Sequence, residues 1–475
     1  MLQRDPLLFL ASSFFLLFTA CASFDAKPII PAATAEHFAA RSLGDEGLQR
    51  FIALHVPHPV EPWPPSHWDL RLLTLVAFYY QPNLDLARGE LAVAQAGRVS
   101  AGERANPTLA LSTQYNMDAA TGTSPWSPGA TLDIPITTAG KRSNRLAQAE
   151  HLTSAARAKL VTTAWQIQTR VRAGMLELYS AKQTRLLLSE QASLQQHVVG
   201  LLRHRVEVGA AAPSEVARAQ RAVNQIQLAI ADAQRAENVA RAKLATTIGV
   251  PLPALQDVVI VASEWVPPPL VNDLVTPAIR GDVLTQHAEI ITALADYEAS
   301  QDALQLEIAK QYPDLTLGPG YVWDAGAAKW SLALSLPLAL LNRNAGPIAE
   351  ASARRERAAA NVLAVQTRLI GEIDQASVTY DTARQQWLLQ ESMLAARLDE
   401  QRYAAAQFKA GALDRLTLTQ QDQDLVVVRL EREHALSVVQ QAHGELEAVL
   451  QRSAALPALL DATLEMDPRR EEPTK

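Results

Sequence analysis

Hydrophobic and polar residues alternate in four short stretches of the chain. In each stretch the apolar side chains share one parity: Leu109, Leu111 and Tyr115; Leu132 and Ile134; Leu315, Leu317, Tyr321 and Trp323; Trp330, Leu332, Leu334 and Leu336. A period of two over about ten residues is typical of a β-strand that faces lipid on one side. The pattern predicts two strand pairs, at 107–136 and 313–337. The edge of a soluble β-sandwich is the alternative interpretation.

Two much longer segments lack helix-breaking residues. No proline occurs from 139 to 206 or from 348 to 408. A helix of about sixty residues, at 1.5 Å per residue, reaches roughly 90–100 Å, which is too long for one compact domain. Such helices must pack along other helices. Gly209 and Gly411 follow the two segments, and glycine is expected just past a helix C-terminus, so each long helix is predicted to turn back as a hairpin.

The order of these features occurs twice. An offset of 202 residues relates Pro135 to Pro337 and Gly209 to Gly411. The proline and the glycine are therefore 74 residues apart in both halves. A match kept in register over this distance indicates an internal duplication. Each half is predicted to contain, in order, a helix, a strand pair, a very long helix, a turn and a final helix.

The duplication predicts the organisation of the whole chain. The expected segments are a lipoprotein signal peptide (1–20), an extended N-terminal tail (21–68), a first repeat (69–249) whose hairpin turns at 205–215, an inter-repeat linker (250–277), a second repeat (278–453) whose hairpin turns at 407–418, and a disordered tail (454–475). The tail at 21–68 is expected to be extended because prolines punctuate it.

The first twenty residues predict export from the cytoplasm. Arg4 precedes an apolar run at 7–18, which is too short to span a bilayer. Small residues then precede Cys21, as in a bacterial lipobox, so Cys21 is the predicted site of lipid attachment. No aspartate follows it, which favours the outer membrane. A plain signal peptide with an incidental cysteine is the alternative.

Composition excludes several other functions. The net charge is −7 and the pI is near 5.9, so no basic surplus indicates nucleic-acid binding. A single cysteine leaves no intrachain disulfide. The sequence has no P-loop, nucleophile elbow or zincin motif, so we expect no enzyme and no cofactor. His55, His58 and His67 lie among prolines without a carboxylate cluster, so we expect no metal site there.

Four membrane strands leave open edges, which lipid cannot hydrogen-bond. The sheet must therefore close with copies of itself. Eight strands make a barrel that is filled by its own side chains, so twelve strands from three chains are the smallest set expected to leave a lumen. The predicted fold is mainly α with membrane β-strands: an internally duplicated chain that forms a trimeric 12-stranded β-barrel, continued by a long α-helical barrel as a coiled-coil tunnel.

The chain resembles the TolC-type outer-membrane factor (outer membrane efflux protein) family, over about residues 70–453. The motifs that carry the resemblance are Tyr80-Gln81-Pro82-Asn83-Leu84, Asn106-Pro107-Thr108-Leu109, Thr138-Ala139-Gly140-Lys141-Arg142, Tyr312-Pro313-Asp314-Leu315 and Leu341-Asn342-Arg343-Asn344-Ala345-Gly346. The third and the last look most like the heavy-metal, CzcC-like branch. The resemblance implies a homotrimer in the outer membrane that works as a passive duct with a periplasmic adaptor protein and an inner-membrane RND-type pump.

The resemblance also implies where the duct is gated. In the family the hairpin ends close the tunnel and dock the adaptor; the corresponding residues here are Glu207, Gly209, Lys409, Gly411, Asp414 and Arg415. Some members carry constriction aspartates six and nine residues after the second turn glycine, where this chain has Thr417 and Gln420. Asp422 and Asp424 could offer a displaced acidic ring, and a solvated helix face is the alternative.

The sequence leaves three hypotheses about function open. The leading one is an efflux duct for heavy-metal cations. A duct of the same fold for drugs, or for type I protein secretion, is the second. The third is a periplasmic coiled-coil scaffold without a pore, which would have no need of four alternating strands.

Overall fold

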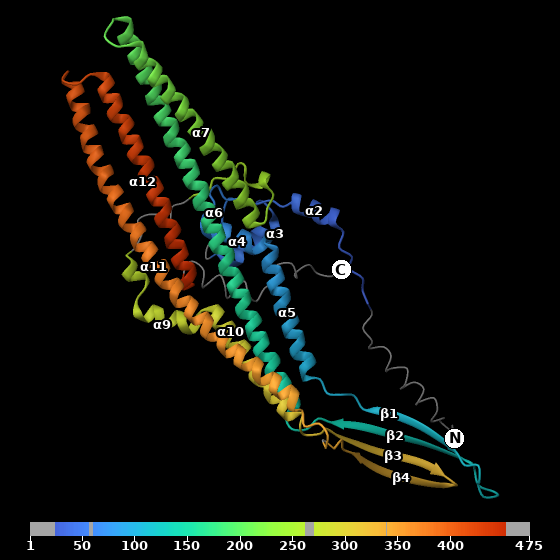
Figure 1. Ribbon diagram of the computed structural model, residues 1–475. Coiled ribbons are helices and arrows are strands. Elements are labelled where there is room, and N and C mark those ends of the chain that lie inside the picture. Colours follow the sequence, from blue (N-terminus) through green and yellow to red (C-terminus); the bar gives the residue numbers. More distant parts are fainter. Residues whose placement is uncertain (1–23, 57–59, 262–269, 339, 453–475) are drawn as a thin grey trace.

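The structure is a computed structural model that describes residues 24–56, 60–261, 270–338 and 340–452. The molecule is elongated, with a small sheet at one end, two helical hairpin tips at the other and a cluster of shorter helices between them (Figure 1). The predicted signal peptide, its Cys21 and the predicted tail at 454–475 lie outside the described residues.

The sheet has four antiparallel strands in the order β1-β2-β3-β4. They are β1 (Thr108–Tyr115), β2 (Trp126–Ile136), β3 (Leu315–Asp324) and β4 (Ala327–Ser335). The two repeats meet where β2 pairs with β3, for example at Ala130 and Tyr321. Strands β1 and β4 each pair with a single neighbour, so both outer edges of the sheet are open in one chain.

The two faces of the sheet differ in chemistry, because opposed residues of antiparallel strands share a face. One face carries these cross-strand pairs: Leu109 with Leu132, Tyr115 with Trp126, Leu317 with Leu334, and Tyr321 with Trp330. The other face is small and polar: Ser112 with Gly129, Gln114 with Ser127, Thr316 with Ser335, and Gly320 with Ser331. The expected alternation therefore gives a sheet with one apolar and one polar side.

Two helices run almost the whole length of the helical body. They are α6 (Lys141–Glu207), of 67 residues, and α11 (Ala345–Lys409), of 65 residues. At 1.5 Å per residue each is about 100 Å long. In the half near the sheet, α5 (Pro82–Gly102) packs on α6, α6 packs on α10 (Ala288–Ala309), and α10 packs on α11.

In the half near the tips, α7 (Pro213–Ile248) and α12 (Arg415–Leu450) replace α5 and α10. The C-terminal ends of α7 and α12 lie against the N-terminal ends of α5 and α10, respectively. The side-chain oxygen of Gln451 accepts a hydrogen bond from the N–H of Ala288, at 3.0 Å. At the other junction the Gln81 side chain donates to the carbonyl of Thr247, at 2.7 Å. A wall of long helices therefore continues from the sheet to the tips.

The segment at 21–68 is not extended as expected, because two helices form within its described part. These are α2 (Pro31–Ala39) and α3 (Glu46–His55). Asp45 caps α3 by accepting from the N–H of Leu48, at 2.8 Å. Pro31 occupies the first turn of α2, where proline is compatible with a helix. The proline-rich composition suggested an extended tail, but the helical spacing of Leu48, Phe51, Ile52 and His55 buries one face of α3.

The middle of the molecule carries the largest apolar core. Helix α3 packs there on α4 (Leu70–Tyr80), and α4 packs against α6 and α7. The segment at 250–277 forms η1 (Leu252–Leu255) and α8 (Val271–Leu274), and α9 (Pro277–Gln286) follows it on the second repeat. A parallel bridge between Trp68 and Ile260 ties this segment to the N-terminal one. The long helices are thus braced at their middle by residues outside the hairpins.

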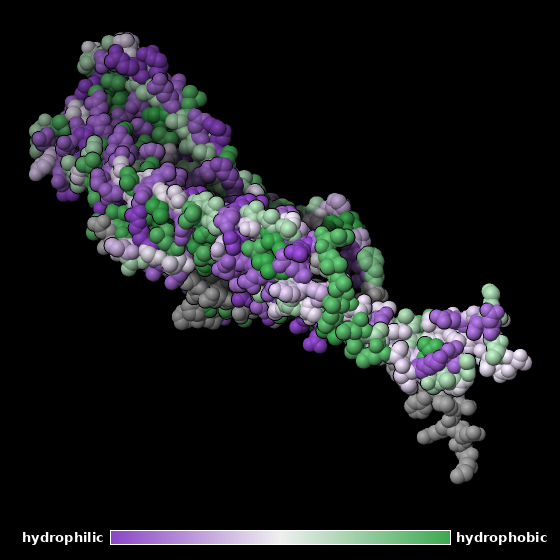
Figure 2. All heavy atoms as spheres, turned by 60° about the horizontal axis from the view of Figure 1, so that its bottom comes forward, coloured by the Kyte–Doolittle hydropathy of each residue, from purple (hydrophilic) through white to green (hydrophobic). Residues whose placement is uncertain are grey.

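The surface changes character along the molecule. On the face drawn in Figure 2, hydrophilic residues dominate the end that carries the tips, and hydrophobic residues gather where the helical body meets the narrow sheet. The strongest apolar patch on this face therefore lies at the junction, away from the tips.

Candidate functional site: the hairpin tips and the tunnel wall

Both hairpins turn with the same backbone geometry. Gly209 has a φ of +74° and Gly411 a φ of +75°, the left-handed conformation that glycine adopts without strain. The N–H of Ala210 bonds to the carbonyl of Arg205, at 2.7 Å, and the N–H of Ala412 bonds to that of Gln407, at 2.9 Å. These are the backbone bonds of a Schellman cap. The duplicated glycines therefore reverse two long helices in the same way.

Asp414 holds three groups at the second tip. As the N-cap of α12 it accepts from the N–H of Thr417, at 2.9 Å, and from the Thr417 hydroxyl, at 3.2 Å. Its carboxylate also pairs with the Arg205 guanidinium of the first tip, at 3.3 Å. The bond from the Thr417 N–H holds the pKa of Asp414 below its usual range. This carboxylate therefore ties the two tips together.

The other predicted docking residues lie on the surface of the same end. Glu207 is exposed and lies 3.5 Å from the ring of His204. Arg415 stacks over the ring of Phe408, with 5.3 Å from its guanidinium carbon to the ring centre. Lys409 is exposed at the end of α11. The tips thus present both charges and small turn residues to solvent, and the docking role of these residues stays a prediction.

The structure places the four predicted constriction residues differently from one another. Gln420 is exposed on α12, and Thr417 is bonded to the cap. Asp422 accepts from the Gln401 side chain, at 3.0 Å, and Asp424 pairs with Arg397. Both aspartates therefore link α12 to α11 within one hairpin, Asp422 by a hydrogen bond and Asp424 by an ion pair. An acidic ring formed by them stays a prediction, and forming it would require these links to break.

A polar seam between α6 and α12 was not predicted from the sequence. From the Arg205–Asp414 pair, 15 residues back along α6 and 15 forward along α12 lead to Glu190 and Arg429, which pair at 3.3 Å. A further 18 residues along each helix lead to Arg172 and Glu447, also at 3.3 Å. The equal spacing along the two helices shows that α6 and α12 lie antiparallel in one fixed register.

The seam ends in a buried polar cluster around Arg172. This side chain is nearly inaccessible, and it donates to Gln440 at 3.3 Å and contacts the His443 ring nitrogen at 3.0 Å. His443 in turn lies against the ring of Tyr380 on α11, with centres 5.4 Å apart. Burial, with Arg172 beside it, lowers the pKa of His443 to about 4. The cluster therefore joins three helices through a charged group and a neutral histidine.

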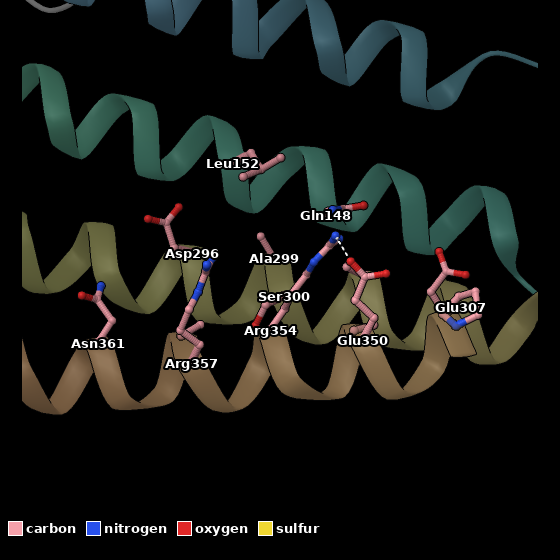
Figure 3. Close-up of a pocket in the computed structure, with 14 residues that line it drawn as sticks. Gln148, Leu152, Asp296, Ala299, Ser300, Glu307, Glu350, Arg354, Arg357 and Asn361 are labelled. Carbon is pink, nitrogen blue, oxygen red and sulfur yellow. Dashed lines mark hydrogen bonds and ion pairs between the residues drawn. The ribbon is translucent and has the colours of Figure 1, made fainter. Parts of the chain in front are cut away.

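A cavity of about 590 Å³ lies along the tunnel wall between α6, α10 and α11 (Figure 3). The charged residues of its lining are Asp296, Glu307, Glu350, Arg354 and Arg357. Glu350 pairs with Arg354, and Glu307 pairs with Lys310. Most of these charges are satisfied along their own helices, which suits a hydrated wall better than a site for one bound ligand.

Two features are absent from the part of the chain that the structure describes. No group of three or more His, Cys, Asp and Glu side chains that could hold a metal ion occurs among them. Within the same residues, no helix combines the length and the apolar character needed to cross a membrane.

Comparison with known proteins relates this architecture to a family. The family model described as outer membrane efflux protein matches twice, at residues 79–250 and 279–451. The chain is 24% identical over 379 residues to the cobalt-zinc-cadmium resistance protein CzcC of Cupriavidus metallidurans, covering 78% of this chain and 87% of that protein.

Solved structures share the fold at lower identity. The outer-membrane channel OprN matches with a TM-score of 0.64 at 16% identity, over 91% of this chain and 98% of that one. The outer membrane protein VceC of Vibrio cholerae matches with a TM-score of 0.62 at 19% identity, over 80% and 95%. The two matched blocks coincide with the two repeats and contain all four strands. The chain belongs to the outer membrane efflux protein family.

Proposed function

We propose that three copies of this chain form a passive export duct across the outer membrane, which carries heavy-metal cations and is gated at the hairpin tips. One observation carries the proposal. The four-stranded sheet has an apolar face and a polar face, and its edges β1 and β4 are open. A sheet with these properties is stable in lipid only when further strands satisfy both edges.

The helical body supports the same assembly. Helices α5 and α11 are the outer members of the four-helix layer near the sheet, on the same sides as β1 and β4. Both expose apolar residues, such as Leu86 and Val93 on α5 and Leu363 and Val378 on α11. Three copies would cover these residues while they close the sheet, so one operation satisfies both ends of the molecule.

The assignment to heavy-metal cations rests on the relative and on the motifs. CzcC is named for cobalt, zinc and cadmium resistance, and the Leu341–Gly346 motif resembles that branch of the family. The polar lining of the wall, with paired acids and arginines, suits hydrated ions that pass without binding. The duct itself supplies no energy, so we propose that a periplasmic adaptor and an inner-membrane pump provide it.

The tips are the proposed gate and adaptor-docking surface. Arg205 and Asp414 connect the first hairpin to the second at their ends, so separating the hairpins must break this pair. The exposed residues Glu207, Lys409 and Arg415 lie beside it. An adaptor that binds these groups would compete for the charges that hold the tips together.

The proposed lipid anchor is tested separately. Mass spectrometry of the N-terminus of the mature protein should find a triacylated Cys21, and a Cys21→Ala variant should lack the added mass. An unmodified residue at this position would remove the anchor from the proposal and leave the duct untouched.

Two experiments test the duct. The purified protein in detergent should have the mass of three chains and, in planar bilayers, conduct ions after adaptor or high-salt treatment opens it. In cells that lack this chain but retain its pump and adaptor, zinc, cobalt and cadmium should become toxic at lower concentrations, and the restored gene should reverse this. Restored resistance to hydrophobic drugs alone would overturn the substrate assignment, and a monomer without conductance would overturn the duct.

A further inference from the structure

A leucine-rich segment follows β4, and its last two leucines, Leu340 and Leu341, align with Thr138 and Ala139 of the first repeat. The side chains of Leu336, Leu338, Leu340 and Leu341 are 44%, 70%, 76% and 102% exposed. At the equivalent place after β2 the chain reads Thr137-Thr138. There the Thr138 hydroxyl donates to the carbonyl of Pro313, at 2.6 Å, and its N–H donates to Asp314, at 2.9 Å. The first repeat thus completes this junction with polar bonds, so the fold does not require exposed leucines.

The register of the sheet gives the height of these leucines in the membrane. Strand β2 runs for 11 residues from Trp126 to Ile136. At 3.3 Å per residue and a tilt of about 40°, this length corresponds to an apolar band about 25 Å tall. Ile136 pairs with Leu315, and Leu336 comes directly after the partner of Thr316. Leu336 is therefore level with the inner edge of that band.

The remaining leucines lie just beyond that edge. The Leu340 N–H donates to the Leu338 carbonyl at 2.8 Å. This bond keeps Leu340 close to Leu338, three residues past the end of β4. Hydrophobic residues gather at this junction on the face drawn in Figure 2. The segment thus continues the apolar face of β4, which carries Trp330, Leu332 and Leu334, into the interfacial layer.

Charged side chains lie at the same end of the helical body. Arg343 is exposed two residues after Leu341, whereas the exposed Arg104 and Arg142 lie near the start of β1, where Arg142 donates to the carbonyl of Gly102. Lys310 is paired with Glu307. Arginine side chains at this depth can reach phosphate groups while apolar neighbours enter the acyl region. Exposed leucines followed closely by an exposed arginine are the arrangement that an interfacial lipid contact requires.

We infer that Leu338, Leu340 and Leu341 form a lipid-binding foot, one per chain, that inserts into the inner leaflet of the outer membrane beside β4. The foot would fix the depth of the sheet in the bilayer. Its occupant is phospholipid, whose acyl chains cover the leucines and whose phosphate groups lie near Arg343. This inference rests on the proposed placement of the sheet in lipid but not on the exported substrate.

The test uses a fluorescent label at single introduced cysteines in the full chain. Leu341→Cys is labelled with bimane and reconstituted in phosphatidylethanolamine–phosphatidylglycerol vesicles that contain lipids with a nitroxide near the head group. Leu334→Cys, on the apolar strand face, is the positive control. Leu228→Cys, an exposed leucine on α7, is the water-facing control. The unsubstituted protein, whose single cysteine is Cys21, provides the blank.

The expected result is quenching of the Leu341→Cys label at least about twofold stronger than that of the Leu228→Cys label, as for groups held in the interfacial layer. Quenching equal to the Leu228→Cys control, with strong quenching at Leu334→Cys, would overturn the foot and leave the duct intact. A Leu341→Cys label that is shielded from nitroxide lipid and crosslinks to another copy would also overturn it. Absence of quenching at Leu334→Cys would instead contradict the membrane placement of the sheet.

Discussion

Arg172 on α6 lies directly beneath Gly444 on α12. A Cβ atom at position 444 would come within 3.0 Å of Nε and 3.2 Å of Cδ of Arg172. The guanidinium is buried and bonded on both sides of this contact, to Gln440 and to Glu447. The glycine therefore provides the space through which a charged side chain crosses the packed seam between the two hairpins.

Replacing Gly444 with alanine should destabilise the protein, although alanine favours helices. The added methyl group forces the buried arginine to shift, and overpacking of this kind costs about 1–3 kcal/mol. Gly371→Ala is the matched control, because position 371 is also inside a long helix and a Cβ there meets nothing within 4 Å. That variant should gain up to about 1 kcal/mol. The midpoint of thermal loss of helical circular dichroism should fall for the first and rise for the second; equal shifts would contradict the close contact.

Removing the link between the tips should make the closed duct leak. Arg205→Ala breaks the pair with Asp414 but leaves both Schellman turns, whose bonds are made by the backbone. An exposed ion pair contributes about 0.2–1 kcal/mol, so the open probability should rise by up to about fivefold per link. Single-channel recording in planar bilayers measures it.

The neighbouring Arg203→Ala provides the control for this measurement. Arg203 bonds to Gln220 within the first hairpin, at 3.3 Å, and does not reach the second. Its loss should leave the open probability unchanged. Equal leaks in both variants would mean that the Arg205–Asp414 pair does not hold the tips together.

The tip link should persist in mildly acidic solution. The Thr417 N–H lowers the pKa of Asp414 from its usual 3.8, so the carboxylate is ionised in the closed tip at every pH above that value. A depressed pKa contributes stability above the unfolded value and loses it only as the pH falls through the lower, folded value. Conductance of the closed duct should therefore be the same at pH 7 and pH 5 and rise only below about pH 4. A rise between pH 7 and pH 5 that Asp414→Asn abolishes would contradict this assignment.

The sequence predicts the repeated elements well, because each depends on local chemistry. Alternation along one strand places Leu109 and Leu111 on one face whatever the rest of the chain does. The turns at Gly209 and Gly411 can be predicted for the same reason, because a left-handed turn after a helix favours glycine wherever it occurs. Their backbone conformations in the structure are nearly identical.

The contacts between elements are harder to predict. Nothing local distinguishes Arg172, which is buried, from the arginines around it, because its burial depends on a glycine 272 positions away. Asp422 and Asp424 could be placed on a helix face from their spacing, but their partners Gln401 and Arg397 depend on the register of α11 against α12. The helix α3 was missed because nearby prolines outweighed a short apolar stripe.

The buried His443 should make stability depend on pH between about 6.5 and 4. Its pKa falls from 6.5 to about 4 in the folded chain because burial and Arg172 disfavour the charged ring. As the pH drops through this window the unfolded chain binds a proton that the folded chain does not, so stability decreases, by at most about 3 kcal/mol per chain. His443→Gln removes this titration and keeps an oxygen that can accept from Arg172. Thermal midpoints at pH 7 and pH 4.5 should therefore converge in this variant relative to the unsubstituted protein. His197→Gln, at an exposed position of α6, should keep the original pH dependence, and an unchanged dependence in His443→Gln would show that the ring is not the responsible group.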